Sequence, residues 1–345
     1  MNNKVLDVQN LKIEIPLASG VLRAVDGINL HVKKGETLCV VGESGCGKSL
    51  TALAIMDLLP KKAIRKITKL DLSGESILNF NESQMSNVRG NKIGMIFQEP
   101  MTSLNPSFSV GNQMVETLYR HKKIRGAEAN KLAIEMLERV GITPAKQRLN
   151  QYPHQLSGGL RQRVMIAMTL LCEPDLIIAD EPTTALDVTI QAQILHLLKE
   201  LQSDFGMGLI FITHDMGVVA RIADRVSVMY AGQIVEEGTV LQIFDDPSHP
   251  YTRGLMRCIP VPGKIKRGNP LGTIPGMVPS LIGDFNECRF SGRWGKNTLS
   301  NKVVKLVPVK DDHLTFEVKS DKNHIVRFCC NECLKLSKSK VVKET

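Results

Sequence analysis

The sequence predicts an α/β fold with a mostly parallel core sheet, and three short apolar runs are the observations that predict it. These runs cover residues 37–41, 176–179 and 209–213, and each is followed by sequence compatible with a helix. Buried strands that alternate with helices are typical of a parallel sheet. A chain of 345 residues is long enough for one such domain plus an extension.

The composition excludes the disordered and membrane-embedded classes and names no function. Hydrophobic residues make up 43% and charged residues 23%, as in ordinary globular proteins. No stretch approaches the roughly 18 apolar residues of a membrane-spanning helix, and the first ten residues lack the apolar core of a signal peptide. We therefore expect a cytoplasmic protein with reduced cysteines, Cys39 and Cys172 being core residues. The net charge of +9 suits nucleotide, nucleic acid or an acidic membrane surface equally.

The N-terminal region is expected to form an antiparallel β subdomain. Residues 5–32 alternate between apolar and polar side chains, with turn signals at 18–20. After the first core strand, residues 50–59 are helix-compatible and Pro60 would stop the helix. These strands would flank whatever binds at the end of the first core strand.

A helical subdomain is expected between the first two core strands, at about residues 100–172. Its clearest helical periodicity covers 127–140 and is closed by Gly141. Near Pro260 the sequence becomes rich in proline and glycine, then in lysine. We therefore predict a main domain over 1–260 and a C-terminal extension over 261–345.

The loop after the first core strand fits the pattern G-x-x-x-x-G-K-[ST], between a strand and a helix as that motif requires. Glycines let backbone N–H groups converge on phosphate oxygens, Lys48 adds a positive charge, and the Ser49 hydroxyl can ligate Mg²⁺. The sequence therefore predicts that the chain binds ATP there and hydrolyses it. The expected nucleotide-binding residues are Gly42, Glu43, Ser44, Gly45, Cys46, Gly47, Lys48, Ser49 and Leu50.

Two carboxylates follow the second core strand, at the sheet edge where open parallel sheets bind ligands. Asp180 can hold Mg²⁺, and Glu181 can accept a proton from the attacking water. The alternative is an acidic pair that caps a helix.

His214 follows the third core strand at the same edge, within expected reach of a terminal phosphate. A histidine taken alone would more often be structural, and the order of the motifs favours the phosphate role. Ser157, Gly158 and Gly159 precede a helical pattern over 162–171 and predict a second anion-binding helix start. The alternative is a simple helix cap. A second phosphate loop is superfluous unless it serves a nucleotide held mainly by another subunit.

In this order, the motifs resemble the nucleotide-binding subunit of ATP-binding cassette (ABC) transporters over about residues 5–281. The resemblance includes Gln98 as the Q-loop, 156–162 as the signature, 185–187 as the D-loop and His214 as the switch. Residues 97–106, 152–155, 179–193, 228–232 and 249–252 further resemble importers of oligopeptides, dipeptides and nickel, in their D-type subunit.

The resemblance implies a P-loop ABC cassette and assigns roles to individual residues. The catalytic residues would be Glu181, His214 and Gln98. The Mg²⁺ ligands would be Ser49, Gln98 and Asp180. The residues that complete a partner's nucleotide site would be Ser157, Gly158, Gly159, Gln162 and Asp187.

The implied partners are a second ABC subunit, either an F-type relative or another copy, and two membrane permease subunits fed by a substrate-binding protein. Residues 101–110 would face the permease, and the chain would sit at the cytoplasmic face of the membrane. ATP would close the paired cassettes and hydrolysis would release them.

The sequence departs from this family in two places. No aromatic residue precedes Phe80, so the aromatic platform for adenine is missing and Ile13 or Ile15 would contact the base, with modest discrimination against GTP. In the extension, Trp294 follows Cys288 where a cysteine is expected, and Cys329, Cys330 and Cys333 lack a clear fourth partner. An iron–sulfur cluster is therefore not expected.

Three alternatives remain beside a peptide importer. The same ATPase could serve a nickel or metal-complex importer. A soluble ABC ATPase acting on nucleic acid is disfavoured because one compact core has no inserted coiled coil, zinc module or second cassette. A catalytically silent regulatory subunit would lack Glu181, His214 or Ser157, and all three are present.

Overall fold

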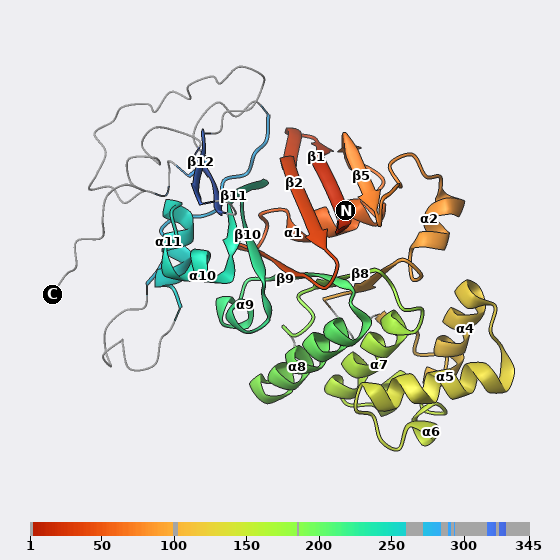
Figure 1. Ribbon diagram of the computed structural model, residues 1–345. Helices are drawn as coiled ribbons and strands as arrows, with labels where there is room; N and C mark the ends of the chain where they lie inside the picture. The colour runs from red at the N-terminus through yellow and green to blue at the C-terminus, as the bar shows by residue number, and fades with distance from the viewer. Residues whose placement is uncertain are drawn as a thin grey trace, which may run out of the picture.

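The computed structural model describes residues 3–98, 103–184, 186–259, 272–283, 289–290, 293, 316–321 and 324–328. Its centre is an eight-stranded sheet in the order β12-β13-β11-β10-β3-β9-β8-β7 (Figure 1). The neighbours from β10 to β7 pair in parallel, and β11, β13 and β12 continue the sheet antiparallel. The bounds are β3 Thr37–Val41, β7 Ile93–Ile96, β8 Leu176–Asp180, β9 Gly208–Thr213, β10 Arg225–Tyr230, β11 Gln233–Thr239, β12 Phe316–Asp321 and β13 His324–Phe328.

The N-terminal strands form a separate antiparallel sheet, as the alternating pattern predicts (Figure 1). A long hairpin joins β1 and β2, with Leu17 paired to Gly20 across the predicted turn. The strands are β1 Lys4–Leu17, β2 Gly20–Lys33, β4 Ile64–Lys66, β5 Lys69–Leu72 and β6 Glu75–Ser76.

Helices follow the strands as expected, with one correction. The first helix was expected over 50–59 with Pro60 as its stop, but α1 covers Lys48–Ile55. Asp57 takes a left-handed backbone with φ 54°, which ends the helix before the proline. The remaining helices are α2 Glu82–Val88, α4 Val110–Lys122, α5 Gly126–Arg139, α6 Ala145–Arg148, α7 Gly158–Leu170, α8 Val188–Phe205, α9 Met216–Ile222, α10 Val240–Asp245 and α11 Pro250–Arg257.

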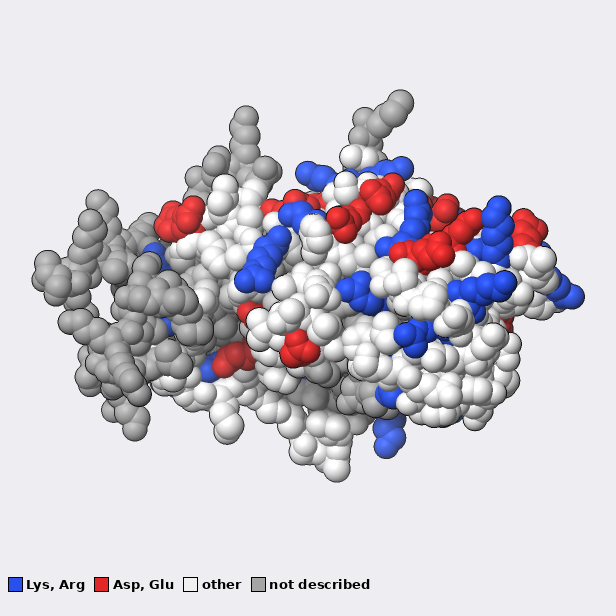
Figure 2. Space-filling view, turned by 90° about the horizontal axis from the view of Figure 1, so that it is seen from below, with Lys and Arg blue, Asp and Glu red and all other residues white. Residues whose placement is uncertain are grey.

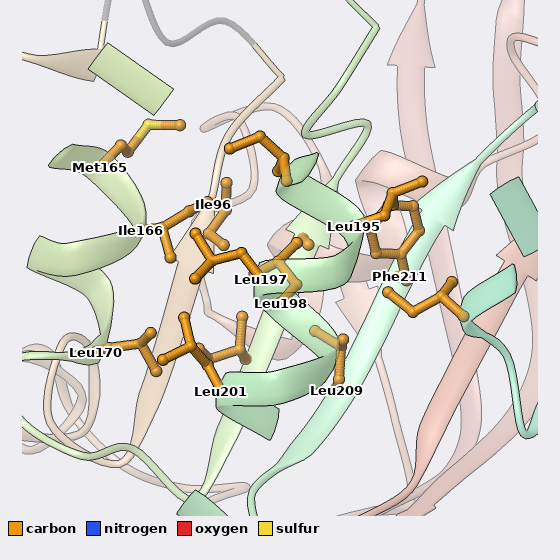
Figure 3. Packing of buried hydrophobic residues seen from close by; sticks show 14 of the residues in the cluster. Ile96, Met165, Ile166, Leu170, Leu195, Leu197, Leu198, Leu201, Leu209 and Phe211 are labelled. Atoms are coloured by element: carbon orange, nitrogen blue, oxygen red, sulfur yellow. The ribbon is translucent and has the colours of Figure 1, made fainter. Parts of the chain in front are cut away.

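The parallel sheet separates two hydrophobic cores, because successive side chains of a strand point to opposite faces. In β9, Leu209 and Phe211 pack with the helices, whereas Ile210 and Ile212 pack with the antiparallel sheet. Figure 3 shows the helical core, where Leu198 and Leu201 of α8 lie between Leu170 of α7 and Leu209 of β9. Cys39 and Cys172 are fully buried, as predicted.

Parts of the chain beyond residue 260 lie against the main domain. Leu22 pairs with Ile282, and the backbone N–H of Arg23 donates to Leu281 O at 3.0 Å. Strand β13 pairs with β11, so it belongs to the main sheet. The boundary at Pro260 lies outside the described residues and stays a prediction. Helices α4 to α7 lie between residues 103 and 172, and their grouping as a helical subdomain over about 100–172 also stays a prediction.

Within the described residues, we find no helix with the length and apolar character needed to span a bilayer.

Candidate active site

The phosphate loop links β3 to α1 at the carboxyl end of the parallel sheet. Two of its glycines are required by close approach. A Cβ on Gly42 would lie 2.1 Å from Met229 O, and one on Gly47 would lie 2.6 Å from Ala24 O. The loop therefore lies directly on strand β10 and hairpin strand β2, which leaves its shape little freedom.

Lys48 places a buried positive charge inside this loop. Its Nζ donates to Gly42 O at 2.7 Å and to Glu43 O at 2.9 Å, and its side chain is almost wholly buried. The Cys46 thiol is also buried, and burial raises its pKa. Cys46 therefore offers a nucleotide its backbone, whereas Ser44, Gly45 and Ser49 are exposed.

Glu181 lies at the carboxyl end of β8, and the structure brings the other two predicted catalytic residues, His214 and Gln98, into contact with it. Its Oε1 lies 3.0 Å from His214 Nδ1, and its Oε2 accepts from Gln98 Nε2 at 3.0 Å. Thr184 Oγ1 also donates to Oε2, at 3.1 Å. Burial raises the pKa of Glu181, but the bonds from His214 and Thr184 outweigh it and lower the pKa below its ordinary value. Glu181 is therefore a carboxylate at neutral pH, as a proton acceptor must be.

Thr184 is a residue that the sequence analysis missed. It stands three residues after Glu181, and its hydroxyl orients the same carboxylate that Gln98 contacts. The signal was available, since a hydroxyl close after a catalytic carboxylate can bond it in a tight turn.

Asp180 has the opposite environment to Glu181. Its Oδ1 is buried without a hydrogen-bond partner. Burial raises the pKa of Asp180, and the adjacent Glu181 charge raises it further, although the nearby Ser49 hydroxyl lowers it in part. A buried carboxylate oxygen without a partner, next to a serine hydroxyl, fits the hard-oxygen donor set that Mg²⁺ prefers. Ser49 and Asp180 therefore fit a Mg²⁺ site. Gln98, the third predicted ligand, donates instead to Glu181, the residue next to Asp180.

The second predicted anion site lies at the start of α7. Ser157 caps this helix by accepting from Leu160 N at 3.4 Å, and Ser157 and Gly158 are exposed. Gln162, expected beside a nucleotide, is instead fully buried, and neither atom of its amide has a partner. Its role in nucleotide binding therefore stays a prediction that needs a rearrangement of α7.

The remaining predicted site residues differ in their exposure to solvent. Asp187 is exposed and caps α8, its Oδ1 accepting from Thr189 N and Ile190 N. Ile13 is fully buried, so of the two expected base contacts only the half-buried Ile15 remains. Of the segment 101–110, expected to face the permease, residues 103 and 105–108 are exposed, whereas Leu104 and Val110 are buried. Ala185, Met101, Cys288, Trp294, Cys329, Cys330 and Cys333 lie outside the described residues.

Comparisons with known proteins agree with the motifs. A family model described as ABC transporter matches residues 25–184, and one described as oligopeptide/dipeptide transporter, C-terminal region, matches 235–297. The chain is 53% identical to the oligopeptide transport ATP-binding protein OppD of Bacillus subtilis over 279 residues, which cover 81% of this chain and 78% of OppD. It is 50% identical to the dipeptide transport ATP-binding protein DppD of the same organism, over 84% of this chain and 86% of DppD.

Solved structures support the same conclusion. The ATP-binding cassette MJ0796, as a dimer in a post-hydrolysis state bound to ADP and Pi, matches with a TM-score of 0.60 at 28% identity. The match covers 68% of this chain and 98% of that one. The resemblance and the fold class predicted from the sequence are thereby confirmed. The chain belongs to the ABC transporter family, whose cassettes bind and hydrolyse ATP, and it carries the C-terminal region of oligopeptide/dipeptide transporters.

Proposed function

We propose that this chain is the ATP-hydrolysing subunit of an importer that powers the uptake of oligopeptides or dipeptides. The observation that carries the proposal is the contact of Glu181 with both Gln98 and His214 at the sheet edge that holds the phosphate loop. This arrangement supplies a base, its orienting groups and a buried cation next to one another.

The chemistry follows from the residues. Backbone N–H groups of the loop and Lys48 Nζ would bind the phosphates, exchanging the carbonyls that Lys48 now contacts for phosphate oxygens. Glu181 would accept the proton of the attacking water. Gln98 and Thr184 hold the Glu181 carboxylate in place for this step. Bound through Ser49 and Asp180, Mg²⁺ would neutralise phosphate charge.

A second cassette would complete the site. Ser157 and Gly158 are exposed at the start of a helix, where N–H groups and the helix dipole favour an anion. We infer head-to-tail pairing with an F-type relative or another copy, so that each signature loop meets the partner's nucleotide. Two permease subunits and a substrate-binding protein would complete the importer, with this chain on the cytoplasmic face of the membrane.

The substrate class rests on the relatives. The names of two relatives at 50% identity or more refer to oligopeptide and dipeptide transport, which favours peptides over nickel or another metal complex. A nucleic-acid partner is not favoured. On the face in Figure 2, Lys and Arg alternate with Asp and Glu, so the described part of that face is not the continuous basic surface that tracks a nucleic-acid backbone.

Uptake in living cells tests the proposal. A strain that lacks this gene should lose uptake of labelled di- and oligopeptides, and the wild-type gene should restore it. Glu181→Gln should fail to restore it, although the protein accumulates. Undiminished peptide uptake in the deletion strain, with loss of nickel uptake, would assign the ATPase to a metal importer instead.

A further inference from the structure

A buried arginine from beyond the main domain reaches the phosphate loop. The Arg293 side chain is only 3% exposed, and its guanidinium forms a two-point ion pair with the carboxylate of Glu43, in which Nη2 lies 2.9 Å from Oε1. The same guanidinium donates to the carbonyls of Ile274, Pro275 and Gly276. Arg293 therefore joins the segment 272–283 to the second residue of the loop.

Glu43 is held at three points, and each comes from a different part of the chain. Its carboxylate meets Arg293, its backbone N–H donates to Tyr251 Oη at 2.9 Å, and its carbonyl accepts from Lys48 Nζ at 2.9 Å. Tyr251 is fully buried in α11. Since Lys48 and Glu43 are bonded directly, whatever fixes Glu43 also fixes the cation of the loop.

Aromatic rings pack around Tyr251, which accepts the hydrogen bond from Glu43 N–H. The rings of Tyr251 and Tyr230 lie 4.5 Å apart, and Phe290 packs against both, at 5.8 and 5.4 Å. The Arg293 guanidinium lies 5.8 Å from the centre of the Tyr230 ring. A guanidinium enclosed in this way is unfavourable without its carboxylate, so the ion pair binds the loop to this cluster.

We propose that Arg293 is a positioning residue for the phosphate loop, and that the C-terminal extension is thereby an integral part of the nucleotide site. The inference rests on the proposed function of that loop. Arg293 touches no phosphate itself; it fixes Glu43 so that Lys48 and the loop N–H groups are arranged before ATP arrives. Because the coupling is reciprocal, bound ATP also stabilises the docking of the extension.

The chain supplies a matched control in Arg289. This residue also comes from the extension and also forms an ion pair with the main domain, but its carboxylate partner is Asp26 of β2, and it donates to Ala231 O. Removing it loosens the same extension at a position away from Glu43. The comparison therefore separates positioning of the loop from docking in general.

The test measures Mg²⁺·ATP affinity of the full chain by calorimetry for Arg293→Gln, Glu43→Gln, the double variant and Arg289→Gln. We expect each of the first two to weaken affinity about 3- to 30-fold, and the double variant to be no weaker than the weaker single, as coupled residues require. Arg289→Gln should stay within about twofold of wild type. Each single variant leaves one charge unpaired, whereas the double variant leaves neither, so the affinity of the double variant decides the question even if a single variant does not fold.

Two results would overturn the proposal. One is wild-type affinity in both Glu43→Gln and Arg293→Gln. The other is an equal loss in Arg289→Gln, which would reduce Arg293 to a docking contact. Lys48→Ala is measured alongside. If the ATP affinity of Lys48→Ala is also unchanged, the loop is not the nucleotide site and the proposed function fails. If Lys48→Ala loses ATP binding while the Glu43 and Arg293 variants do not, only the role of Arg293 is refuted.

Discussion

The two loops of this chain that are predicted to bind anions differ in how many contacts hold them in place. The phosphate loop is bonded from within and from outside, since Lys48 contacts two of its carbonyls and Arg293 and Tyr251 hold Glu43. The signature loop presents Ser157 and Gly158 to solvent with only a helix cap. We therefore expect the phosphate loop to bind its ligand in a single chain, and the signature loop to need a second surface opposite it.

The largest expected effect is the loss of ATP turnover when Glu181 is replaced. Glu181→Gln should leave ATP binding intact and lower turnover of the assembled transporter about 10²- to 10⁴-fold, because the general base is lost while size and shape are kept. Phosphate release and nucleotide affinity are measured together. Turnover within a few-fold of wild type would refute the role of Glu181.

A substitution in the signature loop should impair turnover without impairing ATP binding by the isolated chain. A Cβ on Gly158 would meet nothing within 4 Å, so Gly158→Asp should fold normally and bind ATP like wild type as an isolated chain. Its carboxylate would repel the partner's phosphates, and we expect turnover of the assembly to fall on the order of 10²-fold. Gly158→Ala is the matched control. Weakened ATP binding by the isolated Gly158→Asp chain would mean that the two loops are not independent.

Lys48→Ala should have the reverse pattern. It removes a charge-assisted contact to phosphate, so ATP affinity of the isolated chain should fall about 10- to 100-fold. Titration calorimetry measures it, with Lys62→Ala, an exposed lysine, as control. Affinity that survives the change would contradict the assignment of the phosphate loop.

The smallest effect concerns Asp180 and pH. Its pKa is raised in the folded state, so the folded chain holds this proton more tightly than the unfolded chain, and stability falls as pH rises through the interval between the two pKa values. Without Mg²⁺, Asp180→Asn should therefore raise the melting temperature at pH 7 by up to about 2 °C, and the difference should vanish at strongly acidic pH. Added Mg²⁺ and ATP should stabilise the wild type more than the variant. A variant less stable than wild type at pH 7 without ligand would show that Asp180 is stabilising.

The sequence predicted the candidate site residues better than it predicted the strands and long-range contacts that hold them in place. Strands β3, β8 and β9 could be identified because each is a continuous apolar run, and the order of motifs placed Glu181 and His214 at one edge. Strand β7 was missed because Ile93–Ile96 is too short to show a period between helical patterns. Contacts between positions far apart in the chain, such as Arg293 with Glu43, leave no local pattern at either residue.

Burial was the other property that the pattern could not supply. Ile13 and Ile15 lie two residues apart in β1 and share a face, yet Ile13 is fully buried and Ile15 is only half-buried. Gln162 follows three exposed or half-exposed positions and still lies within the helical core. Both depend on what the rest of the chain packs against them.

Strand β9, whose side chains alternate between the two cores, also leads directly to a predicted catalytic residue. His214 follows directly after the last residue of this strand, and its Nδ1 lies 3.0 Å from Glu181 Oε1. The register of β9 therefore determines where the chain delivers the imidazole. We expect deletion of a single residue within β9 to exchange its two apolar faces and to remove the contact between His214 and Glu181.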